Sequence, residues 1–370
     1  MATISYLTRI EFDFGLAAKL PDFCAELGMK RPLLVTDPGL TALGLIAPIA
    51  QRFVAAPAIF DQTPANPTEA AVMAALAVYE AEGCDGVLAV GGGSSIDLGK
   101  AVRLLAGQAP PLVQYAAVEG GAARITGPLP PLIAVPTTAG TGSEVGRGAV
   151  IVMDDGRKLG ILSALMLPSL AVCDPELTLG LPPLLTAATG MDALAHCLET
   201  FLSAAVNPPA EAIALEGLAR GYGAIRAAVA DGQDRQARWD MMMASMEGAM
   251  AFQKGLGAVH SLSHPMGALP DLMLHHGTLN AVLLPAVLRF NRPAVGDKWE
   301  RLEAMLGGPP DGRIAKLNRE IGLPQGLAAM GVGREQLPAV AAAALLDHCH
   351  ATNPRPASEA DYLAILEESF

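Results

Sequence analysis

The sequence predicts an α/β N-terminal half, built on a parallel sheet, and an all-helical C-terminal half. Up to about residue 180, short β-branched runs alternate with stretches at helical spacing, which is typical of a parallel sheet covered by helices. Beyond Leu181 those runs stop, and alanine, leucine and methionine recur at helical spacing. Proline-rich breaks at 181–183 and 207–209 mark the change, so we expect one domain over residues 1–180 and another over residues 181–370.

Six runs in the first half predict strands: 32–37, 56–61, 86–90, 131–135, 149–154 and 170–174. They are apolar almost throughout, as strands buried on both faces should be, so we expect all six in one parallel layer. Between them, Asn66 as N-cap, Pro67 in the first turn and Glu69 as the capping-box carboxylate predict the start of a helix. In the second half, the spacing predicts helices over 187–202, 210–228, 239–252 and 337–349.

The composition excludes several classes of protein. The chain has 370 residues, 51% of them hydrophobic, which is too apolar for a disordered chain. The net charge is −12 and no run of basic residues occurs, which disfavours nucleic acid as a partner. The five cysteines show no CxxC spacing, and no segment reads as a signal peptide or a membrane span. We therefore expect a cytoplasmic protein with reduced thiols and no membrane partner.

A glycine-rich turn, Gly91-Gly92-Gly93-Ser94, follows the run 86–90 and opens a helix. Glycines let the backbone approach a pyrophosphate closely, and the amides at the helix start attract the anion. Ile96 stands where the third glycine of the GxGxxG fingerprint belongs, so that fingerprint is not met. The alternative is a plain strand-to-helix turn capped by Ser94, with Asp97 at the capping-box position.

A second loop of small residues, 136–144, follows the run 131–135. Its hydroxyl side chains can bind phosphate or ribose, and little in it could pack in a core. Asp37 ends the run 32–37, where a carboxylate could hold an adenosine ribose and repel the 2′-phosphate of NADP. The two loops and Asp37 favour NAD as cofactor, although an acid at a strand end also serves as a turn former.

Histidines gather in the second half at spacings that suit a metal ion. Asp192 and His196 stand at i and i+4 on one face of an otherwise apolar helix, and a buried polar pair needs a partner. Any one histidine of this kind is more often a structural residue, so the argument depends on the further histidines that follow.

His260 and His264 repeat the i, i+4 spacing, although Pro265 biases His264 away from helical geometry. The pair His275-His276 completes the set. Three imidazoles and a carboxylate suit Fe²⁺ or Zn²⁺, and the absence of cysteine at these spacings disfavours a structural thiolate zinc site.

Two cations stand close in sequence to these motifs. Arg147 follows the hydroxyl-rich loop, and Lys254 precedes His260 by six residues. In an acidic chain either could hold a substrate carboxylate, with arginine able to do so through two parallel hydrogen bonds. The alternative for both is a solvated surface position.

Five motifs occur in order along the chain: Gly91-Gly92-Gly93-Ser94 with Asp97 and Lys100, then 136–144, 189–196, 257–267 and His276-Gly277. Together they resemble the iron-containing (group III) alcohol dehydrogenases, and the resemblance covers essentially the whole chain. Within that family, Arg147 and the segments 252–257 and 274–280 are most similar to bacterial 4-hydroxybutyrate dehydrogenases.

The resemblance implies a Rossmann-like NAD-binding domain and a helical metal-binding domain, as in the dehydroquinate synthase-like fold. It implies iron, or zinc, held by Asp192, His196, His260 and His276. His275 is left out, because the family's ligand is the histidine directly before glycine. His264 would lie beside the nicotinamide as a proton relay.

The resemblance also implies a set of cofactor contacts. Lys158 would face the cofactor from a strand edge and take part in catalysis. Together with Asp37 and Lys158, the residues expected to contact NAD are Asn66, Gly92, Gly93, Ser94, Asp97, Thr137, Thr138 and Thr141.

The activity implied is reversible hydride transfer between NAD and a primary alcohol, in a homodimer. Lys254 departs from the commoner family pattern, where an uncharged residue is frequent, and this favours a carboxylated substrate such as 4-hydroxybutyrate, held by Arg147 and Lys254. The alternatives are a maleylacetate reductase or a general alcohol dehydrogenase of the same family. A lyase of the dehydroquinate synthase kind is more distant.

Overall fold

A computed structural model describes residues 8–269 and 272–370. The chain divides into two compact units. Among the described residues, the sheet unit comprises 8–138 together with Gly142–Thr178, and the helical unit comprises Ala139–Thr141 and the residues from Leu179 onward.

Six strands of the described chain form one parallel sheet in the order β1-β8-β5-β4-β2-β3. Successive residues of a strand face opposite sides: Leu33 and Val35 belong to one buried cluster and Leu34 to the other. The strands are β1 (Arg9–Phe12), β2 (Pro32–Val35), β3 (Ala58–Phe60), β4 (Gly86–Gly91), β5 (Leu132–Pro136) and β8 (Leu170–Cys173).

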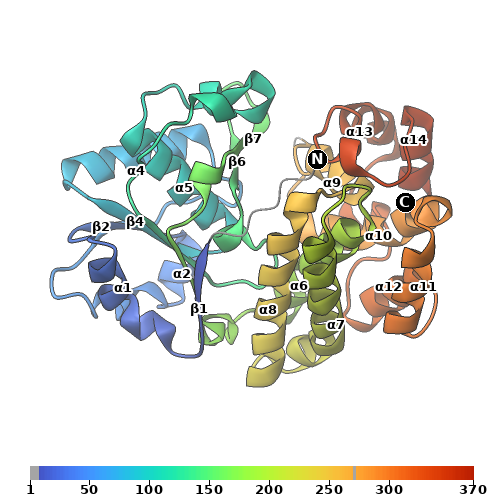
Figure 1. Ribbon diagram of the computed structural model, residues 1–370, viewed down its shortest axis with the longest axis horizontal. Coiled ribbons are helices and arrows are strands. Elements are labelled where there is room, and N and C mark those ends of the chain that lie inside the picture. The colour runs from blue at the N-terminus through green and yellow to red at the C-terminus, as the bar shows by residue number, and fades with distance from the viewer. Residues whose placement is uncertain (1–7, 270–271) are drawn as a thin grey trace. The chain divides into compact units, whose positions relative to one another are not determined.

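Helices cover both faces of this sheet (Figure 1). On one face lie α4 (Glu69–Ala81) and α5 (Gly93–Gly107), and on the other α1 (Leu20–Glu26) and α3 (Ile46–Ala50). The short helix α2 (Pro38–Ala42) follows β2 directly. Burial on both faces explains the apolar runs in the sequence.

The sheet has a point at which its winding direction changes. From β2 the chain moves outward to the edge strand β3 and then returns to β4 on the other side of β2. Loops at the carboxyl ends of two such strands diverge and leave a crevice that favours ligands. Asp37 follows β2 and Gly92 follows β4, so both lie at this switch point.

In the sheet unit, three details differ from the sequence prediction. The run 149–154 is not in the parallel layer: β6 (Gly148–Val152) pairs antiparallel with β7 (Lys158–Leu162) in a separate hairpin. Its residues alternate between buried and half-buried, and Asp155-Gly156 makes a hairpin turn with Gly156 at φ 84°. The edge strand β1 was not predicted. Helix α4 is capped by Thr68, whose hydroxyl accepts the Ala71 amide, and not by Asn66.

The helical unit is built around α6 (Pro183–Leu202), which is buried at every residue from Thr186 onward. Helices α7 (Pro208–Ala230) and α8 (Arg235–Ala251) pack beside it (Figure 1). The rest of the unit consists of α9 (Ala258–Met266), α10 (His276–Asn291), α11 (Asp297–Leu306), α12 (Pro310–Glu320), α13 (Leu337–Ala344) and α14 (Glu359–Glu368). The helix predicted over 337–349 ends at Ala344, and residues 345–349 form a turn.

The predicted fold class, a parallel α/β sheet followed by a helical half, is confirmed. Among the described residues no helix combines the length and apolar character needed to cross a bilayer.

Candidate metal and cofactor site

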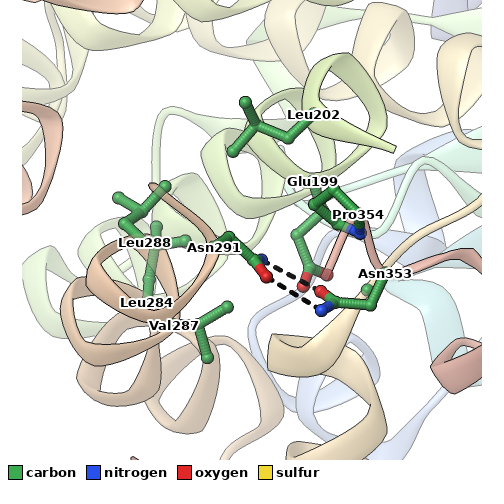
Figure 2. Close-up of a pocket in the computed structure, with 9 residues that line it drawn as sticks. Glu199, Leu202, Leu284, Val287, Leu288, Asn291, Asn353 and Pro354 are labelled. Carbon is green, nitrogen blue, oxygen red and sulfur yellow. Dashed lines mark hydrogen bonds between the residues drawn. The ribbon is translucent and has the colours of Figure 1, made fainter. Parts of the chain in front are cut away.

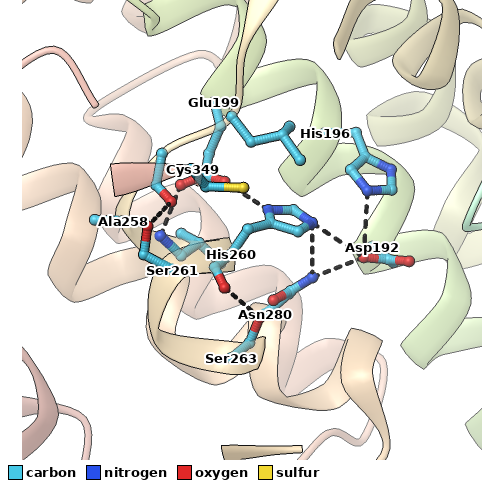
Figure 3. A network of polar contacts seen from close by, with 12 residues as sticks. Asp192, His196, Glu199, Ala258, His260, Ser261, Ser263, Asn280 and Cys349 are labelled. Carbon is cyan, nitrogen blue, oxygen red and sulfur yellow. Dashed lines mark hydrogen bonds and ion pairs between the residues drawn. The ribbon is translucent and has the colours of Figure 1, made fainter. Parts of the chain in front are cut away.

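Helix α6 carries the first part of a candidate metal centre. Asp192 and His196 lie one turn apart on it and are only 3% and 5% exposed. The Nε2 atom of His196 lies 3.8 Å from Asp192 Oδ1 (Figure 3). The predicted i, i+4 pair therefore meets on a buried helix face.

Two further helices bring imidazoles to the same carboxylate oxygen. His260 of α9 places its Nε2 3.8 Å from Asp192 Oδ1, and His276 at the start of α10 places its Nε2 3.7 Å away. The structure thus gathers the four predicted ligands around one point, from elements up to 84 residues apart. His275 directly precedes α10.

The distances to the Asp192 carboxylate fit a bound metal ion. A tetrahedral ion with bonds of about 2.1 Å has ligand atoms about 3.4 Å apart, close to the 3.7–3.8 Å between each imidazole nitrogen and Asp192 Oδ1. The ligand atoms of Asp192, His196 and His260 all lie within 4.8 Å of one another, and His276 approaches this group through the carboxylate. These distances are too long for hydrogen bonds. Three imidazole nitrogens and one carboxylate suit Fe²⁺ or Zn²⁺.

Glu199 orients one of these imidazoles, and the sequence analysis missed it. Its Oε2 lies 2.6 Å from Nδ1 of His260, which leaves Nε2 of that ring to face Asp192. Burial raises the pKa of Glu199 to about 7, against the lowering effect of backbone hydrogen bonds. The sequence could have indicated Glu199, because positions 192, 196 and 199 lie on one face of the same predicted helix.

Glu199 and Asn353 together fix the start of α9. The Val259 amide donates to Glu199 Oε1 at 2.7 Å, and the Ala258 amide donates to Asn353 Oδ1 at 3.0 Å. Asn353 is in turn held by a reciprocal amide pair with Asn291, beside a small cavity also lined by Glu199 (Figure 2). These contacts satisfy two of the amides that any helix leaves unpaired at its start.

Gly257 is required by the same arrangement. A Cβ there would lie 2.7 Å from Asn353 Oδ1 and 3.0 Å from Glu199 Oε1, so only glycine lets both capping oxygens approach.

Asn280, one turn after His276, was also missed. Its Nδ2 donates to Asp192 Oδ1 at 2.7 Å and lies 3.3 Å from His260 Nε2 (Figure 3). The same nitrogen lies 3.1 Å from His276 Nε2. Burial raises the pKa of Asp192, but the neighbouring imidazoles and the Asn280 amide outweigh it and lower that pKa to about 2. The carboxylate is therefore charged and ready to bind a cation.

His264 lies beside this cluster. Pro265 does not end the helix, because α9 continues to Met266, so His264 keeps its helical position. Its ring stacks on that of His276 with centroids 5.4 Å apart, and its Nδ1 lies 2.8 Å from Asp347 Oδ2. Asp347 is a partner that spacing along the sequence could not reveal.

In the sheet unit, the glycine-rich turn lies where the prediction placed it. Gly92 is the N-cap of α5, and Gly93 and Ser94 form its first turn, where backbone amides have no partner within the helix. The Ser94 hydroxyl donates to the Ala65 carbonyl at 2.5 Å.

Asp37 caps α2 by accepting the Leu40 amide at 3.0 Å. A Cβ on Gly91 would lie 3.5 Å from Asp37 Oδ2, so this carboxylate lies against the glycine-rich turn. Asp37 thus serves as a turn former and also faces the switch point.

Asp97 and Lys100 order the hydroxyl-rich loop. Asp97 accepts the Ser143 hydroxyl at 2.6 Å and the Val150 amide at 2.9 Å. The buried Lys100 ammonium donates to Ser143 Oγ and to the Gly146 and Gly148 carbonyls. Both side chains therefore hold the end of this loop, and the strand that follows it, by hydrogen bonds.

The remaining predicted cofactor residues lie at two places. Thr137 is buried after β5, and its amide donates to the Gly91 carbonyl, while Thr138 and Thr141 are half-buried. Lys158 opens β7 and donates to Asn66 Oδ1 at 2.9 Å. Burial lowers the pKa of Lys158, and Asp97 partly offsets this.

The two candidate carboxylate-binding cations differ in their surroundings. Arg147 is exposed in the sheet unit. Lys254 is 3% exposed in the helical unit, and its ammonium donates to the carbonyls of Thr200, Phe201 and Ser203 at the end of α6. Glu211 lies 3.1 Å from the same nitrogen. These acceptors take up all three donors of Lys254, which favours a structural role for it.

Comparison with known proteins gives matches over the whole chain. The family described as "Iron-containing alcohol dehydrogenase" matches residues 8–175, and "Fe-containing alcohol dehydrogenase family, C-terminal" matches residues 186–370. The 4-hydroxybutyrate dehydrogenase of Cupriavidus necator is 57% identical over an alignment of 386 positions covering 100% of both chains.

Two solved structures share this fold. A 1,3-propanediol oxidoreductase is 37% identical, with a TM-score of 0.94 over 100% of both chains. The sulfoacetaldehyde reductase of Bifidobacterium kashiwanohense, solved in complex with NAD⁺, is 26% identical, with a TM-score of 0.88 over 100% of this chain and 98% of that one.

Proposed function

Because this chain belongs to the iron-containing alcohol dehydrogenase family, and is therefore an alcohol dehydrogenase, we propose that it transfers hydride between NAD and a hydroxy acid such as 4-hydroxybutyrate. The aldehyde product would be succinate semialdehyde. One observation carries the proposal: three imidazole nitrogens surround one carboxylate oxygen at 3.7–3.8 Å. The full-length similarity to a 4-hydroxybutyrate dehydrogenase supports the substrate class.

Asp192, His196, His260 and His276 would hold the metal, for which we propose Fe²⁺, with Zn²⁺ as the alternative. A divalent metal so bound would supply a Lewis acid that lowers the pKa of an alcohol and polarises an aldehyde. Glu199 orients the His260 ring, and Asn280 holds the Asp192 carboxylate. These contacts keep the ligand atoms directed at one point.

NAD would bind to the sheet unit at the switch point. The first-turn amides of α5 would hold the diphosphate, with Gly92, Gly93 and Ser94 at the contact and Thr137 and Thr138 as further contacts. Thr141, which belongs to the helical unit, remains a predicted cofactor contact. Asp37 would hold the adenosine ribose. Asn66, Asp97 and Lys158 would make the other contacts with the cofactor. The related reductase solved with NAD⁺ supports this choice of cofactor.

His264 would move the proton that alcohol oxidation releases. Its Nδ1 is held by Asp347 at 2.8 Å, which fixes the ring and leaves Nε2 to exchange the proton. The hydride itself would pass to the nicotinamide, whose chemistry belongs to the cofactor. Lys158, with its lowered pKa, would be the second ionisable group facing the cofactor.

The substrate carboxylate would be held by Arg147, whose exposed guanidinium can make two parallel hydrogen bonds. Lys254 is the weaker candidate for this contact, because its ammonium already donates to three carbonyls.

An assay of NAD reduction against matched substrates tests the proposal. 4-Hydroxybutyrate should be oxidised with a higher kcat/KM than 1-butanol, which has the same chain length and no carboxylate, and than 1,3-propanediol. Equal kcat/KM values for the three substrates would indicate a general alcohol dehydrogenase with no preference for a carboxylate. Reduction of maleylacetate in preference to succinate semialdehyde would identify a maleylacetate reductase instead.

The assembly and location also belong to this proposal. We expect a cytoplasmic homodimer, with residues 1–180 binding NAD and residues 181–370 binding metal. The five cysteines are all unpaired, which agrees with a reducing compartment. Light scattering on the purified protein, with twice the monomer mass expected, tests the dimer.

A further inference from the structure

A second group of metal-ligating side chains lies in the helical unit. His264 of α9 and Asp347-His348-Cys349, in the turn after α13, each bring one ligand atom to within 4.8 Å of the others. His264 Nδ1 lies 2.8 Å from Asp347 Oδ2, His348 Nδ1 lies 3.7 Å from Asp347 Oδ1, and Cys349 Sγ lies 3.5 Å from His348 Nε2. The group is distinct from the four ligands around Asp192.

These side chains reach from the interior to the surface. Cys349 is 2% exposed, and the side chains of Asp347, His264 and His348 are 14%, 27% and 62% exposed. The rings of His264 and His348 stack with centroids 5.8 Å apart at 17°. An ion could therefore enter past His348 and reach the buried sulfur.

The chemistry of the donors points to a soft divalent ion. Two imidazoles, one carboxylate and one thiol are the donor types that hold tetrahedral zinc, with neighbouring donor atoms about 3.4–3.7 Å apart. One ligand atom from each of the four residues already lies within 4.8 Å of the others, so each donor needs to shift by about 1 Å or less to reach this range. The His264 Nδ1–Asp347 Oδ2 pair, at 2.8 Å, must open.

We propose that His264, Asp347, His348 and Cys349 form a second metal site, for Zn²⁺ or another divalent ion that accepts thiolate. When the ion binds, a bond forms between it and the Cys349 sulfur, and the thiol proton leaves to solvent. No electron is transferred.

Occupation of this site would inhibit the enzyme, a consequence that rests on the function proposed above for His264. An ion bound to Nδ1 of His264, the nitrogen that faces Asp347, would keep the ring proton on Nε2, so Nε2 could no longer accept the proton that alcohol oxidation releases. Because the same ring stacks on His276, the two sites are adjacent, and excess zinc would act beside the first site without displacing its ion.

Cobalt titration of the full-length protein tests the second site directly. Protein loaded with one equivalent of Zn²⁺ should bind one further equivalent of Co²⁺ and develop the near-ultraviolet absorption of a thiolate-to-cobalt bond. Cys349→Ser should abolish this band, and His348→Ala should weaken the second equivalent at least tenfold. Cys84→Ser, which removes a half-buried thiol of the sheet unit, is the matched control and should leave the band unchanged.

Two outcomes would overturn the site: no uptake beyond the first equivalent, or a thiolate band that survives Cys349→Ser. His260→Ala tests the two metal sites separately. It should abolish metal binding at the site around Asp192 and keep the cobalt–thiolate absorption of the second site. In the NAD-reduction assay, Zn²⁺ should inhibit the parent enzyme at least tenfold more strongly than His348→Ala, each compared with its own zinc-free rate. Equal inhibition would overturn the link to His264, and the spectral result stands even if the protein reduces no NAD.

Discussion

Asp37 has one observed role and one proposed role, and a single substitution can separate them. Its Oδ1 caps α2, and its carboxylate lies against the turn that would hold the NAD diphosphate. A like charge beside the 2′-phosphate of NADP costs several kcal/mol when the contact is partly desolvated.

Asp37→Asn should therefore raise the ratio of kcat/KM for NADP to that for NAD by about tenfold or more, since it removes the charge and keeps an acceptor for the Leu40 amide. Steady-state kinetics with both cofactors measure the ratio. Asp37→Gly, which also removes the cap, is the companion variant. A parent enzyme that already prefers NADP would contradict the placement of Asp37 at the ribose.

Arg147 and Lys254 should differ sharply on substitution. Arg147→Ala should lower kcat/KM for 4-hydroxybutyrate by about 30-fold or more if the bound substrate buries the pair, because truncating one partner of a buried charge pair costs about 2–5 kcal/mol. The values for 1-butanol should change little, since that substrate never makes the contact. An equal loss of kcat/KM for both substrates would show that Arg147 supports the fold or cofactor binding and does not hold the substrate carboxylate.

Lys254→Met should instead lower stability without changing substrate preference. It removes the buried donor of the Thr200 carbonyl, while Lys298 still donates to the Phe201 and Ser203 carbonyls and to Glu211. Leaving a buried polar group without its partner costs about 1–3 kcal/mol. Thermal or urea unfolding measures the loss. A selective loss of 4-hydroxybutyrate oxidation, with stability intact, would restore Lys254 as a substrate contact.

At the scale of elements, α9 is held at its first turn by side chains from other segments. Glu199 and Asn353 accept its first two amides, and Gly257 makes room for both. The position of His260 along the helix therefore depends on this cap.

Gly257→Ala should weaken metal binding by about 10–100-fold, as loss of outer-shell support does, because the new methyl group would push the capping oxygens away. Metal content after dialysis at fixed free metal measures this. Gly223→Ala is the matched control: this glycine lies within α7 with no atom within 4 Å of a new Cβ, so the variant should keep its metal and gain up to about 1 kcal/mol of stability. Full metal occupancy in Gly257→Ala would show that the cap does not position His260.

At the scale of the whole molecule, the predicted metal would join α6, α9 and α10 within one unit. A ligand at about 1,000 times its dissociation constant stabilises the folded state by about 4 kcal/mol. Removing it should therefore lower the Tm of the helical unit by about 10 °C.

Calorimetry of the metal-loaded and the chelator-treated protein tests this. His276→Ala should abolish the difference, because it removes one of four ligands, and its metal content should fall with it. NAD should raise the stability of the sheet unit in both forms. A Tm that does not change with chelator would contradict stabilisation by the metal. A His276→Ala variant with full metal content and activity would show that His276 is not a ligand.

The sequence by itself determined what depends on local spacing. Alternating strand and helix runs predict the parallel α/β half, and i, i+4 spacing places Asp192 with His196 on one helix face. Such features can be predicted from the sequence, because the repeat of a helix or strand fixes which residues share one of its faces. The other two ligands, His260 and His276, were predicted from the resemblance of their motifs to the iron-containing alcohol dehydrogenases and not from spacing.

Only the tertiary structure decided which side chains from distant segments meet. Glu199 against His260, Asn280 against Asp192, and Asp347 against His264 are contacts between different elements, and no spacing along the chain encodes them. The same holds for Lys254, whose acceptors lie some fifty residues earlier at the end of α6, and for the pairing of β6 with β7 instead of the main sheet. The physical reason is that a buried polar group must find its partner wherever packing brings one, and packing is a property of the assembled elements rather than of any one of them.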